Sequence, residues 1–462
     1  MESRVRALND APVRPRAAYV LYWAQMNRRA DSNHALEFAA ARANALKIPL
    51  LVCEGLTCSY PYANDRFHTF ILEGVAETSR RLSKRGIGYL FHLRRRRGDP
   101  NDALYRLAAQ AALVVTDDYP TFVARDHNRR VPARLDVPYI AVDSSCVIPM
   151  RLFEKKEYAA YTIRPKVHRL LDAHLRPVER VALRVRFAAA SLLPAELHTE
   201  VTADNIASLV ASCEIDHSVA PALGCQGGRL AAEARLRHFI EHDLKRYAAD
   251  RNEPSAHATS NLSPWLHFGQ ISSLEIALAA KLHAEDHGYS AAEFLEELIV
   301  RRELAFNHAN FAADPKSLAN VPNWARETLR KHDGDERPWI YTQEQFERAE
   351  THDALWNATQ KEMLLRGKIH GYYRMYWGKK VIEWSRSHQE ALDTMIYLHD
   401  RYALDGRDPN TYTNILWCFG LHDRPWQERA IFGMIRYMGL EGMKRKTGVN
   451  AYVHEISQLE KQ

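Results

Sequence analysis

The chain has 462 residues, a length that favours two domains over one compact core. Hydrophobic residues make up 46% and charged residues 26% of the sequence, and every apolar run is shorter than the ~18 residues of a membrane span, which excludes a disordered or membrane-spanning protein. The net charge of +6 permits a polyanionic partner, and six scattered cysteines without a CxxC pair indicate neither a disulfide framework nor a metal site, which favours a reducing, cytoplasmic compartment.

The first 157 residues carry the pattern of an α/β domain. Residues 1–16 are polar, lack the apolar centre of a secretory signal, and are predicted to form a disordered arm. Between residues 17 and 157, amphipathic stretches separate five short apolar runs at 17–23, 48–56, 87–93, 112–118 and 137–143. This alternation predicts a doubly wound parallel sheet, with the first helix beginning at the cap cluster of Asp31, Ser32 and Asn33.

A connector and a helical domain are predicted to follow. Residues 158–226 are irregular, and the pairs Arg164-Pro165 and Arg176-Pro177 are expected to break helices. Residues 227–462 show helical periodicity with few β-branched alternations, which predicts an all-α second domain. No GxGxxG follows the first predicted strand, so the first domain lacks an ordinary dinucleotide fingerprint.

Tryptophan is concentrated near the C-terminus, where five of nine tryptophans lie between Leu355 and Trp426. Trp377 and Trp384 are seven residues apart and share one face of a predicted helix, while Lys379 points away from that face. Two indoles at this spacing are, on their own, ordinary core aromatics. The surrounding strings LLRGKIHGYYRMYWGKKVIEW, LDGRDPNTYTNILW and HDRPWQERAIFGMIRYM carry more information.

With these strings the chain resembles the class II cyclobutane pyrimidine dimer photolyases of the photolyase and cryptochrome superfamily. The resemblance also rests on YWAQMNRRADSNHAL, EYAAYTIRPKVHRLL, SNLSPWLHFGQIS and FLEELIVRRELAFNH, and so covers essentially the whole length. It implies the photolyase/cryptochrome fold, with an α/β domain that holds an antenna pigment or nothing and an all-α domain that binds FAD. The implied antenna is of the 8-hydroxy-deazaflavin or folate type.

The resemblance assigns the FAD site to three segments. The SNLS string can cap a helix and offer backbone amides to a phosphate, although such a string is more often only a cap. Arg374 and Asp405 are implied to pack against the isoalloxazine ring, where a guanidinium favours negative charge. The residues expected to bind FAD are Tyr247, Ser260, Leu262, Ser263, Arg374, Asp405, Asp408 and Asn410.

One position near the cofactor departs from the family pattern. The class II pattern reads YLND, whereas this chain reads YLHD, which places His399 at an asparagine that contacts the flavin N5 edge. Because histidine titrates near neutral pH and asparagine does not, photoreduction is predicted to depend on pH between about 5 and 8. The alternative is a packing substitution away from the flavin edge.

The resemblance also places residues around a DNA lesion. Glu297 is expected to hydrogen-bond the base edge, although a lone glutamate on a helix is more often solvated or paired. Trp417 is the aromatic implied to stack beneath flipped bases, and Arg301 stands where other members have a second tryptophan. With His399, Glu297 and Trp417 form the expected catalytic set.

Electron transfer is assigned in the same way. Trp377, Trp356 and Trp384 are implied to be the route by which oxidised flavin is photoreduced, with Trp377 as the first donor. The route is not expected to act in repair itself.

Basic and aromatic residues alternate near the C-terminus. A charge run alone is usually a solvated face, but this mixture is typical of phosphate contacts combined with filling of the gap left by extruded bases. By resemblance, Arg436 and Trp426 belong to a region that invades the duplex. The residues expected to bind DNA are Arg251, Arg301, Arg424, Trp426, Arg429, Arg436 and Lys444.

The predicted function is light-dependent repair of cyclobutane pyrimidine dimers in duplex DNA by a monomeric carbon–carbon lyase. An electron from photoexcited reduced FAD splits a dimer flipped out of the duplex, and the poor pairing of the dimer lowers the cost of flipping. The rival is a cryptochrome-like blue-light receptor without repair activity, against which Glu297, Trp417 and the lack of a long C-terminal tail argue. Repair of (6-4) photoproducts is a weaker rival, because no histidine pair matches its pattern.

Overall fold

A six-stranded sheet organises the N-terminal part of the computed structural model, which describes residues 1–188 and 194–461. The sheet has the order β1-β6-β5-β2-β3-β4. Strands β2 to β6 are all parallel to one another, and β1 alone among the named strands is antiparallel. The predicted parallel sheet is therefore confirmed, and its strand order reverses at β2. The strands are β1 (Val5–Ala7), β2 (Tyr19–Ala24), β3 (Leu50–Thr57), β4 (Gly88–Arg94), β5 (Ala111–Asp117) and β6 (Tyr139–Val142).

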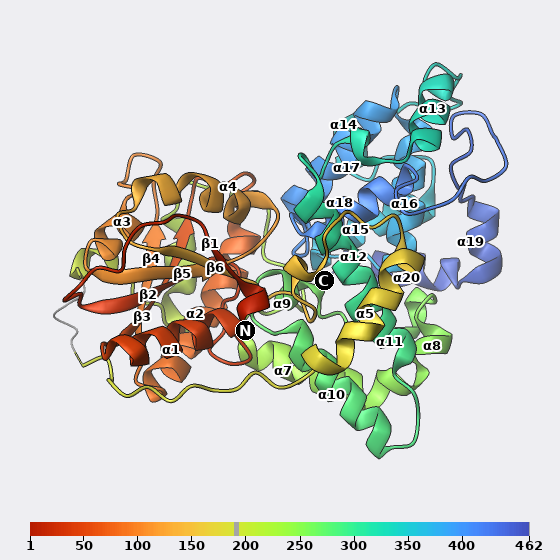
Figure 1. Ribbon diagram of the computed structural model, residues 1–462. Helices are drawn as coiled ribbons and strands as arrows, with labels where there is room; N and C mark the ends of the chain where they lie inside the picture. Colours follow the sequence, from red (N-terminus) through yellow and green to blue (C-terminus); the bar gives the residue numbers. More distant parts are fainter. Residues whose placement is uncertain (189–193, 462) are drawn as a thin grey trace.

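Helices cover both faces of this sheet, as a doubly wound domain requires (Figure 1). On one face α1 (His34–Leu46) packs against β2 and β3, and on the other α3 (Ala103–Ala108) packs against β2 and β5. The side chain of Asn33 accepts hydrogen bonds from the amides of Ala35 and Leu36, which confirms the predicted helix start. The remaining helices of this part are α2 (Asp65–Lys84) and α4 (Phe122–Arg130).

The prediction of a disordered N-terminal arm is wrong. Residues Glu2–Arg4 form a 3-10 turn, and β1 follows and pairs antiparallel with β6. The buried Arg4 guanidinium donates to the carbonyls of Asp143, Cys146 and Val147 at 2.6–3.2 Å. Without β1, β6 would be an edge strand with unpaired backbone groups, and β1 pairs with them although its sequence carries no apolar signal.

The connector is less irregular than predicted. Helix α5 (Ala160–His174) contains Pro165, so the expected break at Arg164-Pro165 is wrong. Proline in the second turn removes one backbone hydrogen bond, and the turn it affects carries the exposed Tyr161. The helix does end before Arg176-Pro177. Residues 189–193 of the predicted connector lie outside the described residues, and α6 (Ile206–Ala211) lies in its last part.

The C-terminal half is helical, which confirms the predicted all-α domain; the named strands of the described residues all lie before residue 143 (Figure 1, green to blue). Two π-helical turns, Phe239–Asp243 and Glu296–Arg301, interrupt its helices. The helices are α7 (Arg229–His238), α8 (Tyr247–Asp250), α9 (Ser263–His267), α10 (Ser273–Asp286), α11 (Ala292–Leu295), α12 (Arg302–Phe311), α13 (Asn323–His332), α14 (Gln343–Glu347), α15 (Ala354–Arg366), α16 (Gly371–Trp384), α17 (His388–Tyr402), α18 (Pro409–Cys418), α19 (Leu440–Lys446) and α20 (Val449–Leu459).

The two halves are in close contact. Gly269 follows α9 with a φ of +65°, and a Cβ there would lie 1.8 Å from the Met26 carbonyl oxygen of the α/β domain. The Arg29 guanidinium donates to the Gly269 carbonyl at 3.0 Å, and the Tyr119 hydroxyl donates to Asp408 at 2.7 Å. The α/β domain thus supports the loops on which the candidate site is built.

Candidate functional site

A cavity of about 770 Å³ opens in the helical domain among α8, α16, α17, α18 and the π-helical turn Glu296–Arg301. This volume lies in the usual range of ligand sites, ~300–1,000 Å³. The cavity brings together fourteen residues that the sequence analysis selected: Tyr247, Arg251, Ser260, Ser263, Glu297, Arg301, Arg374, Trp377, His399, Asp405, Asp408, Asn410, Trp417 and Arg436.

An ion pair between Arg374 of α16 and Asp405 lies in the wall of this cavity. Nη2 of Arg374 lies 3.0 Å from both carboxylate oxygens of Asp405, and the Ser263 hydroxyl donates to the same carboxylate at 2.7 Å. Burial alone would raise the pKa of Asp405, but Arg374 and the neighbouring Lys368 outweigh it and hold that pKa below its ordinary value. Asp405 therefore stays charged and anchors the guanidinium at the cavity.

Lys368 is a cavity residue that the sequence analysis missed. Its Nζ donates to Asn261 Oδ1 at 2.6 Å, and burial lowers its pKa to about 8. It follows Gly367, which ends α15 with a φ of +66°. A lysine directly after a helix-ending glycine, within the string LLRGKIH, was the available signal for a second cation beside Asp405.

Asp408 has both of its oxygens engaged by protein groups. Oδ1 accepts from the backbone amide and the side-chain amide of Asn410, at 2.9 and 2.8 Å, and Oδ2 accepts from the Tyr119 hydroxyl. The hydrogen bond from the Asn410 backbone amide makes Asp408 the N-cap of α18. This carboxylate shapes the turn at the cavity and ties it to the α/β domain.

His399 lies on α17 with its ring edge-on to Trp377, at a centroid distance of 5.0 Å. Its Nδ1 is 3.0 Å from the Met395 carbonyl, which can only accept, so Nδ1 carries the hydrogen and Nε2 is an acceptor. Nε2 is buried and has no hydrogen-bond partner among the described residues. Burial, reinforced by the charge of Arg374, lowers the pKa of His399 to about 3. The predicted titration between pH 5 and 8 is therefore wrong, because burial keeps the imidazole neutral over that range.

The three predicted electron-transfer tryptophans form one buried cluster, in which Trp356 stacks on Trp377 and meets Trp384 edge-to-face. Trp356 of α15 lies between the two tryptophans of α16, with its ring centroid 5.9 Å from that of Trp377 and 6.2 Å from that of Trp384. Indole Nε1 of Trp356 donates to the Trp377 carbonyl, and Nε1 of Trp377 donates to Gln360, both at 3.0 Å. The cluster runs from the cavity wall, where Trp377 lies, to Trp384.

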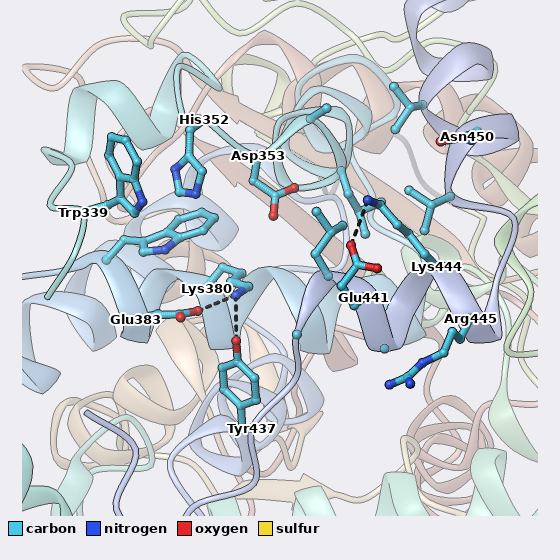
Figure 2. Close-up of a pocket in the computed structure, with 18 of the residues that line it drawn as sticks. Trp339, His352, Asp353, Lys380, Glu383, Tyr437, Glu441, Lys444, Arg445 and Asn450 are labelled. Carbon is cyan, nitrogen blue, oxygen red and sulfur yellow. Dashed lines mark hydrogen bonds and ion pairs between the residues drawn. The ribbon is translucent and has the colours of Figure 1, made fainter. Parts of the chain in front are cut away.

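Beyond Trp384 the aromatic contacts continue towards the surface (Figure 2). The ring of His352 lies 4.9 Å from Trp384 and 4.5 Å from Trp339, on which it stacks with an interplanar angle of 22°. Trp339 is 50% exposed, and the sequence analysis did not select it. It lines a separate surface groove of about 1110 Å³, together with Arg429 and Lys444. These two predicted DNA-binding residues therefore do not line the cavity that holds Trp417.

Glu297 lies at the cavity on the π-helical turn between α11 and α12. Its carboxylate accepts a hydrogen bond from Arg251 Nη1 at 2.7 Å, and the two side chains are 39% and 30% exposed. The adjacent Glu296 instead pairs with Arg164 and Arg301, at 2.7 and 3.4 Å. Of the two neighbouring glutamates, Glu297 is the one that lines the cavity.

A ladder of alternating cations and indoles leads from the surface into the cavity. The Arg424 guanidinium lies 4.6 Å from the centroid of Trp426, and the Arg436 guanidinium lies 5.1 Å from Trp426 and 5.6 Å from Trp417. Trp426 is 38% exposed, whereas Trp417 is half-buried in the last turn of α18. Such a ladder suits bases that leave a duplex and stack on aromatic faces.

The residues present fit a bound flavin nucleotide. Two buried nitrogens that line the cavity, His399 Nε2 and Arg374 Nε, have no hydrogen-bond partner among the described residues. Leu262 is the one predicted FAD-binding residue that does not line the cavity, since its side chain is packed in the core beside it. Across residues 1–188 and 194–461 we find no group of three or more His, Cys, Asp or Glu arranged to hold a metal, and no helix long and apolar enough to cross a membrane.

Comparisons with known proteins agree with this fold. A family model described as DNA photolyase matches residues 20–183. The deoxyribodipyrimidine photo-lyase of Methanothermobacter thermautotrophicus is 40% identical over 457 residues, which are 99% of this chain and 98% of that protein.

Two solved structures confirm the predicted photolyase/cryptochrome fold. A class III photolyase from Agrobacterium tumefaciens superimposes with a TM-score of 0.66 at 18% identity, over 96% of this chain and 87% of its own. A cryptochrome from Synechocystis gives a TM-score of 0.64 at 17% identity, over 89% and 84%. With the identity to the archaeal enzyme over nearly the whole of both chains, these findings show that this chain belongs to the DNA photolyase family.

Proposed function

We propose that this protein repairs cyclobutane pyrimidine dimers in duplex DNA by a light-dependent reaction, with FAD as its cofactor. The observation that carries the proposal is that one cavity is lined both by the residues assigned to FAD and by those assigned to the lesion. The names of the relatives, deoxyribodipyrimidine photo-lyases, support the same reaction. Lesion and cofactor would then lie close together in one cavity, as electron transfer between them requires.

FAD would be held by Tyr247, Ser260, Ser263, Asn410 and the Arg374–Asp405 ion pair. When bound and reduced, it supplies the photoexcited electron that splits the cyclobutane ring. The Arg374 guanidinium, with one nitrogen that has no hydrogen-bond partner among the described residues, would offer positive charge to a bound flavin ring. His399 lines the same cavity, and its buried Nε2, an acceptor without a partner among the described residues, would suit an N–H donor.

The lesion would contact Glu297 and Trp417. The Glu297 carboxylate can accept a hydrogen bond from a base N–H, and the Arg251 guanidinium at 2.7 Å offsets its negative charge. Trp417 offers an aromatic face for the flipped bases, and base–aromatic stacking contributes about 1–3 kcal/mol per base. The ladder of Arg424, Trp426 and Arg436 fits the gap that the flipped bases leave in the duplex.

The electron route to the flavin would use the three neighbouring buried tryptophans. Trp377 lines the cavity, Trp356 stacks on it, and Trp384 follows. With a flavin bound, Trp384, Trp356 and Trp377 would form the path along which an electron could reach it under light. The class II assignment, supported by the seven sequence strings, belongs to the same proposal, in which Arg301 and His399 are the two departures from the family pattern.

A light-dependence assay decides between repair and reception of light. Dimer-containing oligonucleotide is incubated with chemically reduced protein, in blue light and in darkness, and thymine recovery is measured. Recovery in the light alone supports repair, while no recovery in the light would leave the cryptochrome-like receptor, whose fold is shared, as the better interpretation.

Three further expectations form part of this proposal. The six free cysteines suit a reducing compartment such as the cytoplasm. We also expect a monomer, checked by light scattering during size-exclusion chromatography. An antenna of the folate or 8-hydroxy-deazaflavin type is expected in the α/β domain, and the absorption spectrum of the purified protein tests it.

A further inference from the structure

Lys379 of α16 is a buried lysine that no part of the proposed mechanism uses. The residue is 0% exposed, and its Nζ donates to the Cys418 carbonyl at 2.6 Å. The same Nζ lies 5.3 Å from the ring centroid of Trp417. Among the described residues Lys379 has no ion-pair partner, although an isolated buried ammonium is costly. As predicted, Lys379 points away from Trp377 and Trp384; its ammonium lies behind Trp417, which lines the cavity.

The surroundings of Lys379 explain how the charge is tolerated. Cys418 is the last residue of α18, and its carbonyl is one of the groups that carry the negative end of the helix dipole. Burial lowers the pKa of Lys379 to about 8, with Asp423 acting to raise it and Arg436 to lower it. The Cys418 thiol, its pKa raised to about 11 by burial, stays neutral at physiological pH. The ammonium is therefore held by a helix end and an indole face.

We propose that Lys379 is a positioning residue for the lesion: its ammonium fixes Trp417 in the stacking orientation and supplies positive charge behind the pocket. The inference rests on the proposed function and assigns a role that neither Glu297 nor Arg436 fills. Trp417 has cations at 5.3 and 5.6 Å, from Lys379 and Arg436, and only Lys379 is fully buried. Because the Lys379 ammonium is fully buried, its charge acts with little screening by water.

The charge matters because the lesion carries an extra electron during repair. One electron enters the dimer, two carbon–carbon bonds of the cyclobutane ring break, and the electron returns, so that the reaction is redox-neutral. Lys379 remains protonated throughout and transfers no proton. Its positive charge lowers the energy of the negatively charged lesion, and the fixed indole keeps the bases in place.

The test compares Lys379→Met and Lys379→Arg with the wild type. Lys380→Met, at the next position, is the matched control, because Lys380 pairs with Glu383 at 2.5 Å and its cation–π contacts are to Tyr376, Trp384 and Tyr437 and not to Trp417. The first readout is affinity for dimer-containing and undamaged duplexes, by fluorescence anisotropy. The second is the repair yield of chemically reduced protein at saturating lesion. Circular dichroism and flavin absorption verify that each variant is folded and loaded.

We expect Lys379→Met to weaken binding of the dimer-containing duplex about tenfold, in line with a desolvated cation–π contact, and to leave binding of undamaged DNA unchanged. Its repair yield at saturation should also fall, while Lys379→Arg retains part of both. In the wild type, lesion affinity should decline as pH rises from about 7 to 9, since the ammonium is lost there, and Lys379→Met should show no such decline.

Equal losses on damaged and undamaged DNA, or a pH profile shared by wild type and Lys379→Met, would overturn the inference and leave Lys379 as a helix cap. If Lys379→Met does not fold, the wild-type pH profile and Lys379→Arg still decide. A wild type without light-dependent repair would overturn the proposed function instead, so the two failures are distinguishable.

Discussion

The indole of Trp356 stacks on that of Trp377 with ring centroids 5.9 Å apart and planes inclined by 9°, although the residues are 21 positions apart. Both side chains are fully buried. Two nearly parallel indoles in contact give strong electronic overlap, and their burial excludes water from the path. Trp377 and Trp384 share helix α16, but it is Trp356 from α15 that connects them.

This geometry predicts that Trp356→Phe interrupts photoreduction as completely as Trp377→Phe does. Phenylalanine keeps an aromatic ring in the core but is much harder to oxidise than tryptophan. The measurement is the loss of oxidised flavin absorption under blue light with a thiol reductant. Repair by chemically reduced protein should stay near the wild-type level in both variants. If repair and photoreduction fall together, these tryptophans support the structure and the route is wrong.

His399 is expected to have no influence on the pH profile of photoreduction between 5 and 8. Its pKa of about 3 results from burial, with a further contribution from Arg374, so the imidazole is neutral throughout that range. The profiles of wild type and His399→Asn should therefore have the same shape. A midpoint between 5 and 8 that disappears in His399→Asn would show that the ring is more hydrated than its burial implies.

The same residue predicts an effect on stability in acid. The folded-state pKa of His399 is below its ordinary value of 6.5, so the unfolded chain takes up the proton first. Its contribution to stability is present above pH 6.5 and is lost as pH falls towards 3, by up to about 1.4 kcal/mol per pH unit. Urea unfolding of wild type and His399→Asn at pH 7 and pH 5 measures the difference, which should be smaller for the variant.

Arg436→Ala should weaken binding of lesion DNA more than that of undamaged duplex. The guanidinium contacts Trp417 and Trp426 together, and each cation–π contact contributes about 0.5–2 kcal/mol. Lys444→Ala is the control, because Lys444 is exposed, pairs with Glu441, and lies at the separate groove. Titrations at several salt concentrations should show similar small changes for Lys444→Ala on both duplexes. If Arg436→Ala loses the same affinity for lesion DNA and for undamaged duplex, Arg436 is only a phosphate contact.

The sequence predicted much of the fold because its signals are local. Alternating apolar runs identified five strands, and Asn33 capped the helix that was expected to begin there. The errors arose where tertiary contacts override local patterns. Strand β1 forms because β6 needs a partner, and Pro165 stays within α5 at the cost of one hydrogen bond.

For the site, the sequence predicted which residues take part but not their burial or their partners. The family resemblance selected fourteen residues that the fold gathers around one cavity. It gave no information about burial, so the pKa of His399 and the buried charge of Lys379 became visible only with the structure. Nor could it show that Arg251 pairs with Glu297, because the two are 46 positions apart and lie on different elements.

That pair leads to the last prediction, which concerns Arg251→Gln. If Arg251 acts as a phosphate contact, its loss weakens the binding of damaged and undamaged DNA alike. The slope of log affinity against log salt concentration then falls by about one. The ion pair with Glu297 predicts a different result. Without Arg251, the Glu297 carboxylate faces the lesion uncompensated, and a negative charge there opposes electron arrival. We therefore expect an almost unchanged affinity for undamaged duplex and a lower repair yield at saturating lesion.

A double variant that removes both charges provides the control. In the double variant Arg251→Gln, Glu297→Gln no uncompensated carboxylate remains, so the repair yield should recover relative to Arg251→Gln alone, to the level of Glu297→Gln. The two single variants and the double variant form a double-mutant cycle, whose coupling energy measures the interaction between Arg251 and Glu297. Buried charged pairs typically reach several kcal/mol, and exposed pairs about 0.2–1 kcal/mol. Since both side chains are about a third exposed, the lower part of that range is expected for binding. Strictly additive effects on the repair yield would show that Arg251 acts on DNA and not through Glu297.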